Sequence, residues 1–430
     1  MTLSGRVRLS RILELRWLRL GPLDLAVPIG IGLIVGNALD QLGRPVLGIP
    51  FAACWLAVWL ATFAAGSIAF GSRARSGAAL LLVQILSLWL LYDLLYLQQG
   101  NHLYDLNVYL GSAARWLDGG QAYLTAPLAA WPDGPRNDFF LYPPPLLPFF
   151  AVLEQLPQAL VAAAWTAVMV ACSYAAFRLL GLGRGWSLAL LAFPPVFIGF
   201  ESGNVASLTF LLFAASVRAG GALVVDGLFK VQAGVPVLWL IRERRFRALV
   251  AGAVLVAVAV LITLPIVGTD AWRAWWEGLG YRATSQLEVP ALYGYSYARE
   301  IPPVVYAVAC AAFVALALAF RGRAGLAALG LASVFASPAL WPHGFAFALP
   351  AVMLLQSDVA VLIVLGAGSL EANMWLLFIA GWAAVLAARR QPNGALHPML
   401  GKEGPWPRRM ATRPQTKAPR PFGARGQLAD

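Results

Sequence analysis

An aspartate stands where a long apolar run gives way to polar residues, in the segment Asp105-Leu-Asn-Val-Tyr109. From Val108 to Leu117, apolar residues recur at helical spacing, which predicts an amphipathic helix lying on a membrane surface. A carboxylate held at such a boundary can accept the proton of an attacking sugar hydroxyl, and partial burial would set its basicity. An aspartate here can also cap the helix N-terminus, so the spacing leaves both roles open.

Lys230 is a cation inside an apolar stretch that lies between Arg218 and Arg242. Both flanks are expected on the same side of the membrane, and roughly 22 residues cannot make two full crossings. We therefore expect a re-entrant helical pair that turns near Lys230. Such irregular backbone is tolerated only beside a protein-enclosed or water-filled cavity, which makes the lysine a functional candidate. An ion pair with Asp226, four residues earlier, is the structural alternative.

Two shorter polar breaks interrupt apolar runs further along the chain. Glu201-Ser-Gly-Asn204 alone is typical of a turn. His343 ends the stretch that begins at Ser337-Pro338, at the expected outer end of a span, where it could donate to a phosphate oxygen. A capping or interfacial histidine fits the same pattern. The three cysteines and three histidines show no metal-ligand spacing, so the sequence predicts no metal site.

Membrane helices are the elements that must position these side chains. Hydrophobic residues make up 60% of the 430 residues and charged residues 12%, far from the averages of a soluble domain. Several apolar runs reach the roughly 20 residues that one crossing requires. They are residues 46–70, 78–97, 160–180, 248–267 and 304–320. The sequence therefore predicts an all-α polytopic membrane protein, a bundle of about ten to twelve transmembrane helices.

Clusters of arginine predict which helix ends face the cytoplasm. They lie at 6–19, 73–75, 178–184, 242–247, 321–323 and from 389 onward. This distribution places both termini inside the cell and two long polar segments, 99–140 and 268–303, outside a multi-pass plasma-membrane protein. Trp272, Trp275 and Trp276 of the second segment fit an interfacial aromatic belt.

Three regions follow from this pattern. Residues 1–20 are expected to lie along the inner leaflet as a basic interfacial segment, and residues 21–388 to form the membrane domain. Residues 389–430, rich in proline, arginine and glycine, are expected to be a disordered cytoplasmic tail. Most of the net charge of +12 lies in cytoplasmic loops and termini, where anionic membrane lipid accounts for it. Nucleic acid is therefore not an expected partner, and no obligate protein partner is predicted.

Together, these motifs resemble glycosyltransferase family 87, which comprises polyprenol-phosphate-dependent glycosyltransferases of the GT-C superfamily. The resemblance covers roughly residues 78–350. It rests on Asp105 to Tyr109, Gly119 to Tyr123, Tyr142-Pro143-Pro144, Gly203-Asn204, Gly227 to Gln232, the arginine-rich inner loop, and Ser337-Pro338 before His343.

The resemblance implies a GT-C fold in which Asp105 acts as general base in an inverting transfer at the outer face. The implied donor is a polyprenyl-phosphate sugar, with mannose suggested by characterised members, and the acceptor is a lipid or glycan. Lys230 and His343 match positions that hold the donor phosphate, where positive charge helps the leaving group. The sugar and acceptor cleft would be formed by Tyr109, Tyr142, Asn204 and Gln232. Because the donor carries no nucleotide, no cofactor is implied.

The chain departs from the family pattern at two points. Gly203-Asn204 stands where members often have Gly-Gln-x-Asn, and four residues separate Pro338 from His343 where members usually have Ser-Pro-His. A competing hypothesis is a transporter or flippase of a lipid-linked glycan, with Lys230 as its midplane substrate site. It accounts less well for Asp105 and the Tyr/Pro-rich external segment. A noncatalytic scaffold, the third possibility, would tolerate replacement of Asp105 and Lys230.

Overall fold

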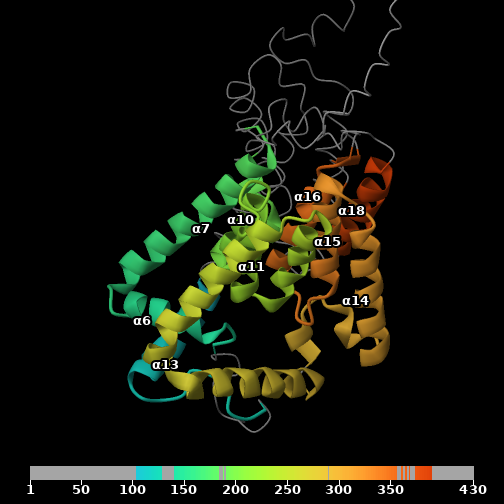
Figure 1. The fold of residues 1–430 in the computed structure, drawn as a ribbon. Helices are drawn as coiled ribbons and strands as arrows, with labels where there is room; N and C mark the ends of the chain where they lie inside the picture. The colour runs from blue at the N-terminus through green and yellow to red at the C-terminus, as the bar shows by residue number, and fades with distance from the viewer. Residues whose placement is uncertain are drawn as a thin grey trace, which may run out of the picture.

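The computed structural model describes residues 103–127, 140–183, 187, 190–288, 290–355, 360–361, 364–365, 368 and 373–389. Within these ranges the protein is helical and has no β-strand, apart from an isolated bridge between Gly294 and Leu340 (Figure 1). The predicted all-α class is therefore confirmed for the described part of the chain. The predicted spans 46–70 and 78–97, the segment 1–20 and the tail beyond 389 lie outside it.

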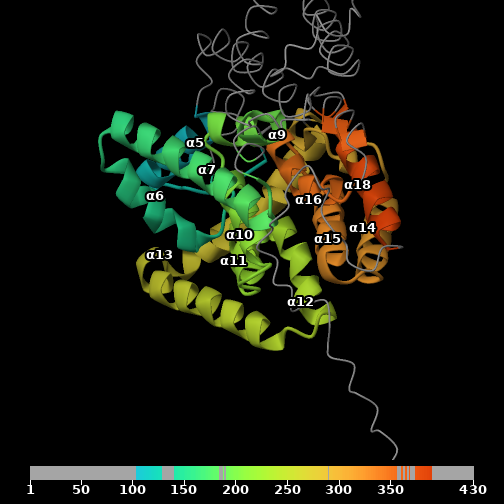
Figure 2. The same ribbon diagram turned by 90° about the horizontal axis from the view of Figure 1, so that it is seen from above.

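The first described helices form one group and the last helices another, with α9 to α12 between them (Figure 2). The first group and the adjoining α9 and α10 are α5 (Tyr104–Leu117), η4 (Pro144–Leu146), α6 (Leu147–Glu154), α7 (Gln158–Leu180), η5 (Leu190–Ala192), α9 (Pro194–Glu201) and α10 (Ala206–Ala215). Proline stands in the first turn of η4, α6 and α9, where its fixed φ and missing N–H suit a helix start.

The later elements surround a largely buried helix, α15. They are α11 (Ala222–Phe229), η6 (Val231–Val237), α12 (Leu238–Arg242), α13 (Phe246–Glu288), η7 (Pro290–Tyr293), η8 (Tyr297–Arg299), α14 (Pro303–Leu318), α15 (Gly322–Phe335), η9 (Pro342–Ala348), α16 (Leu349–Val352) and α18 (Trp375–Ala388). Every residue of α15 from Gly325 to Phe335 is buried, and the helix packs against α14, α16, α18, η6 and η9. The core of this half therefore forms around α15.

Among the described helices, α7 and α13 are long and apolar enough to cross a membrane. They match the spans predicted at 160–180 and 248–267. The first half of α13 exposes its apolar side chains, with Leu261 67% and Ile262 63% accessible. Water would make such exposure costly, whereas lipid would not, so this surface suits a bilayer.

Helix α13 changes direction at Gly268, whose φ of 74° lies in the left-handed region that favours glycine. Beyond Gly268 it continues as a helix across the end of the bundle (Figure 1). We call residues 269–288 the surface helix. Most of the segment 268–303, which is predicted to be external, is thus helical, and its placement outside the membrane stays a prediction. Trp272, Trp275 and Leu279 recur at helical spacing and give this stretch a face to pack.

Helix α5 exists as predicted, but its apolar stripe faces the protein. Leu106, Tyr109 and Ala113 are buried, and α5 packs against α6. The apolar spacing therefore reflects packing inside the molecule, and its attribution to a membrane surface is wrong for this stripe.

The segment between α10 and α13 folds back on itself as predicted. Helix α11 ends at Phe229, Lys230 is extended (φ −140°, ψ 124°), and η6 returns alongside α11. The two arms come close at glycine, because a Cβ added to Gly227 would lie 3.3 Å from the Gly234 Cα. The predicted turn at Lys230 is confirmed, while the placement of this hairpin in a membrane stays a prediction.

The basic loops gather at one end of the helices. Arg242 Nε donates to the Leu318 carbonyl oxygen at 2.7 Å, and Arg245 donates to the Ser216 carbonyl oxygen at 3.3 Å. These hydrogen bonds join the loop before α13 to the ends of α10 and α14. Two of the arginine-rich segments predicted to be cytoplasmic, 242–247 and 321–323, therefore lie at the same end of the described helices.

The two segments predicted to be external meet at the other end of α13. Trp275 Nε1 donates to the Leu141 carbonyl oxygen at 3.2 Å, and a Cβ on Gly278 would lie 3.2 Å from the Leu124 carbonyl oxygen. The surface helix thus contacts the segment between α5 and η4 at two places, Leu124 and Leu141. This contact is consistent with the prediction that both segments lie on the same, outer side of the membrane.

Candidate active site

Four segments far apart in the sequence bring polar side chains into one hydrogen-bonded chain. It runs from Asp105 through Asn204 and Lys230 to His343. One member each comes from α5, the turn between α9 and α10, the break between α11 and η6, and η9. The polar breaks singled out in the sequence therefore converge on one place.

Asp105 lies in the first turn of α5, which begins against the end of α9. Its backbone N–H donates to the Ser202 carbonyl oxygen at 2.8 Å. Leu103 occupies the N-cap position, so the capping role considered for Asp105 is wrong. The Asp105 carboxylate instead accepts a hydrogen bond from Asn204 Nδ2 at 2.9 Å. Its place in the first turn, near the positive end of the helix dipole, also favours negative charge.

Asn204 is oriented by the turn in which it stands. Gly203 has a φ of 71°, and a Cβ there would lie 2.8 Å from the Leu106 Cβ, so only glycine lets the turn approach α5 this closely. Asn204 Oδ1 accepts from the Ala206 N–H at 2.9 Å and from Lys230 Nζ at 3.0 Å. With two donors at its oxygen, the amide must turn its NH₂ group toward Asp105.

Lys230 supplies the positive charge of the chain. Its Nζ donates to Asn204 Oδ1 and contacts His343 Nε2 at 3.3 Å. Asp226, one turn earlier, is fully buried and neither of its carboxylate oxygens has a hydrogen-bond partner. The ion pair proposed as the alternative for Lys230 is therefore not formed.

His343 is buried in η9 and completes the chain. A lysine ammonium can only donate hydrogen bonds, so His343 Nε2 accepts from Lys230. The imidazole is then neutral, with its proton on Nδ1. In this arrangement Nε2 holds the lysine in place, which differs from the predicted donation to phosphate.

Burial determines the basicity of Asp105. It raises the pKa of this carboxyl above the usual value of 3.8, because desolvation disfavours the charged form. The hydrogen bond from Asn204, the charge of Lys230 and a hydrogen bond from Ser202 lower the pKa in part. The result is a carboxylate more basic than an ordinary aspartate, held beside a cation. Ser202 was missed as a partner because its position within a turn motif gives no chemical signal.

Tyr109 and Tyr142 lie close to this chain but within an aromatic cluster. Their hydroxyl groups are 2.9 Å apart, and their rings meet edge to face with centroids at 5.2 Å. Tyr109 is 3% exposed and Tyr142 8% exposed, and both rings also pack near Phe140. Both rings pack within this cluster, and the role implied for them at a sugar and acceptor cleft stays a prediction.

Gln232 follows Lys230 by two residues but is not joined to the hydrogen-bonded chain within the described structure. Its backbone carbonyl oxygen accepts from Ser333 Oγ at 2.8 Å, which fixes η6 against α15. The role implied for Gln232 at a sugar cleft stays a prediction.

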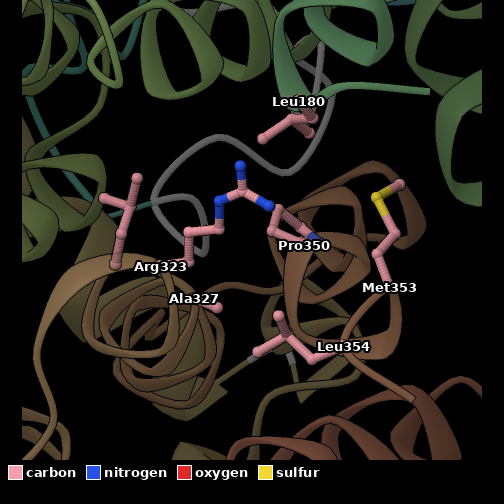
Figure 3. Close-up of a pocket in the computed structure, with 7 residues that line it drawn as sticks. Leu180, Arg323, Ala327, Pro350, Met353 and Leu354 are labelled. Atoms are coloured by element: carbon pink, nitrogen blue, oxygen red, sulfur yellow. The ribbon is translucent and has the colours of Figure 1, made fainter. Parts of the chain in front are cut away.

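A separate small pocket lies where α7 ends and α15 begins (Figure 3). Leu180, Arg323, Pro350, Met353 and Leu354 are among the residues that line it, and none of the four members of the hydrogen-bonded chain does. In the described part of the chain, no group of three or more His, Cys, Asp or Glu residues could hold a metal ion.

A half-buried acid and lysine, joined through a buried amide to a buried histidine, form a polar cluster within the helical, apolar part of the protein that the structure describes. Residues 140–338 match the family model of glycosyltransferase family 87, and no curated protein and no solved structure matched the chain. We therefore assign this region to glycosyltransferase family 87, which confirms the resemblance drawn from the motifs over those residues.

The match indicates a glycosyltransferase, and members of the matched family are membrane proteins. Tyr142, Asn204, Lys230 and Gln232 fall inside the matched region, whereas Asp105 and His343 lie outside it. The match is also narrower than the range of roughly 78–350 expected from the motifs. Asp105 and His343 are thus connected to the family region by hydrogen bonds of the fold.

Proposed function

We propose that this protein transfers a sugar from a polyprenyl-phosphate donor to a lipid or glycan acceptor, with inversion, at the outer face of the plasma membrane. The observation that carries the proposal is the hydrogen-bonded chain from Asp105 to Lys230, which places a base and a cation one amide apart. Mannose is the sugar that we favour, in line with the family resemblance.

Asp105 is proposed as the general base. Its carboxylate takes the proton of the acceptor hydroxyl as the hydroxyl oxygen attacks the anomeric carbon. The raised pKa strengthens the carboxylate as a proton acceptor, while its contacts with Asn204 and Lys230 favour the ionised form. Asp105 is therefore a candidate base that lies outside the matched region in sequence but is hydrogen-bonded to Asn204 within it.

Lys230 is proposed to bind the donor phosphate. As the bond between the anomeric carbon and the phosphate oxygen breaks, polyprenyl phosphate leaves with increased negative charge, which a nearby ammonium stabilises. Inversion requires the attacking and leaving oxygens on opposite faces of the anomeric carbon. The separation of Asp105 from Lys230 by the Asn204 amide is consistent with a sugar between base and phosphate.

The outer face is supported by the distribution of the loops. The basic segments share one end of the helices, and the surface helix and the segment after α5 share the other. By the positive-inside rule the basic end is cytoplasmic. Asp105 lies at the start of α5, on the same side as the surface helix, so its chemistry would occur outside the cell. A polyprenyl-phosphate sugar suits that side because it carries no nucleotide.

The first test is sugar transfer from a radiolabelled polyprenyl-phosphate mannose, comparing wild type with Asp105→Asn in the same nanodiscs. Asn has the size of Asp but cannot accept a proton, so transfer should fall by a factor of about 100 or more. Asn107→Ala, on the exposed side of the same helix, is the matched control and should retain wild-type transfer. Equal transfer by wild type and Asp105→Asn would exclude this base. Wild-type lipid translocation without transfer would favour the flippase alternative.

A further inference from the structure

The residues between α15 and η9 form an irregular connector, Ser337 to Trp341, that leads directly to His343. Its carbonyl groups cannot be satisfied by a helix. Three of them accept hydrogen bonds from the surface helix and the segment after it. The pairs are Ser296 Oγ to the Ser337 oxygen at 2.6 Å, Gln286 Nε2 to the Pro338 oxygen at 3.3 Å, and the Tyr295 N–H to the Leu340 oxygen at 2.7 Å.

The hydrogen bond from Ser296 to Ser337 is buried, and the one from Gln286 to Pro338 is partly buried. Ser296 is 4% exposed, Gln286 7% and Ser337 2%, so a lost partner would leave a carbonyl group unpaired away from water. Gly294 completes the contact with a φ of 57°, and a Cβ there would collide with the Leu340 carbonyl oxygen. The connector is therefore fixed by side chains and by a glycine that no larger residue can replace without movement.

The connector ends two residues before His343, which accepts from Lys230. A lysine ammonium has three N–H donors, and here Asn204 Oδ1 and His343 Nε2 occupy two of them. The direction of the third donor is then set by the other two. Movement of His343 would turn this donor away from an incoming phosphate.

We propose that Gln286, Gly294 and Ser296 are positioning residues for the donor phosphate. They hold the connector so that His343 orients Lys230, and they thereby join the surface helix to the donor side of the site. The inference rests on the proposed function, because it assigns the phosphate to Lys230. It adds a mechanical link between a segment outside the active site and the binding of the polyprenyl-phosphate donor.

A double-mutant cycle between Ser296→Ala and His343→Gln tests this link through the KM for polyprenyl-phosphate sugar. Ser296→Ala alone should raise the donor KM on the order of tenfold, the worth of one buried hydrogen bond, and leave the acceptor KM unchanged. In the His343→Gln background the same change should add little, because the two residues act in series. Additive effects, or equal changes in both KM values, would overturn the proposal.

A second measurement does not depend on activity. In protein labelled with ¹⁵N-histidine and placed in bilayers, solid-state NMR reports the tautomer and hydrogen bond of His343, and His343→Gln identifies its signals. Gly294→Ala should shift them. Gly280→Ala is the matched control on the surface helix, because a Cβ there meets nothing within 4 Å. This variant should leave the His343 signals unchanged. Unchanged His343 signals in Gly294→Ala would overturn the positioning role. Absence of sugar transfer by wild type would instead count against the proposed function, with this measurement still deciding the inference.

Discussion

At the scale of single residues, Asn204 links the proposed base to the proposed phosphate ligand. Its Nδ2 donates to Asp105, a contact that lowers the pKa of the carboxyl against the effect of burial. Asn204→Ala removes this donor, so the pKa of Asp105 should rise further. The acidic limb of the pH profile of kcat/KM should then move to higher pH, because the base must lose its proton before it can act.

The measurement is sugar transfer across the acidic pH range for wild type, Asn204→Ala and Asn107→Ala. Asn107 is exposed and is not a member of the hydrogen-bonded chain from Asp105 to His343, so its variant should keep the wild-type pH profile. A shift of the limb to lower pH in Asn204→Ala, or an unchanged limb, would contradict the assignment of Asp105 as the titrating base.

Residue types alone were sufficient to predict the members of this chain, but not their contacts. Asp105, Lys230 and His343 stood out because charged or ionisable groups are rare in apolar surroundings. Their hydrogen bonds connect positions separated by 99, 26 and 113 residues, and no local pattern encodes such pairings. Tyr109 and Tyr142 were placed at a cleft because tyrosine suits sugar binding, while the fold uses their rings as buried packing.

At the scale of elements, the turn between α9 and α10 determines where Asn204 stands. Gly203→Ala introduces strain at a φ of 71° and a contact of 2.8 Å with the Leu106 Cβ. The variant should lose about 1–3 kcal/mol of stability and shift Asn204 away from Asp105, which would also reduce transfer. Thermal unfolding in detergent and transfer activity measure the two effects.

Gly119→Ala separates the strain from the collision. Gly119 has a similar φ of 78°, but a Cβ there meets nothing within 4 Å. This control should lose stability through strain while retaining transfer. If Gly119→Ala and Gly203→Ala lost transfer equally, the close approach of the turn to α5 would not matter to the site.

Element boundaries were harder to predict than element type. The apolar run of α13 was recognised, but Gly268 was read as the end of a helix. Glycine permits a change of direction as readily as a stop, and the choice depends on packing of the following residues against Leu124 and Leu141. Packing partners so distant in sequence are not visible in a local pattern.

At the scale of the whole molecule, the separation of basic loops from the surface helix predicts a fixed orientation in the membrane. In a variant with Cys54, Cys172 and Cys310 replaced by alanine, a single cysteine can be introduced at either end. Trp276→Cys should react with a membrane-impermeant maleimide added to intact cells, because Trp276 is 71% exposed on the proposed outer side.

Arg247→Cys, at the exposed start of α13, is the matched site at the basic end. It should react only after the cells are permeabilised. The reverse pattern would place the surface helix and Asp105 in the cytoplasm and would contradict the proposed outer-face transfer.

The direction change at Gly268 also limits the length of the first, straight part of α13. From Phe246 to Gly268 the helix rises about 1.5 Å per residue and so spans roughly 33 Å, close to the thickness of a bilayer's hydrocarbon core. In a bilayer, a crossing of this length would set the distance between the basic loops and the surface helix, which contacts the segment after α5. The height of the proposed reacting groups above the lipid would then depend on bilayer thickness, so that lipid would help to align donor and acceptor.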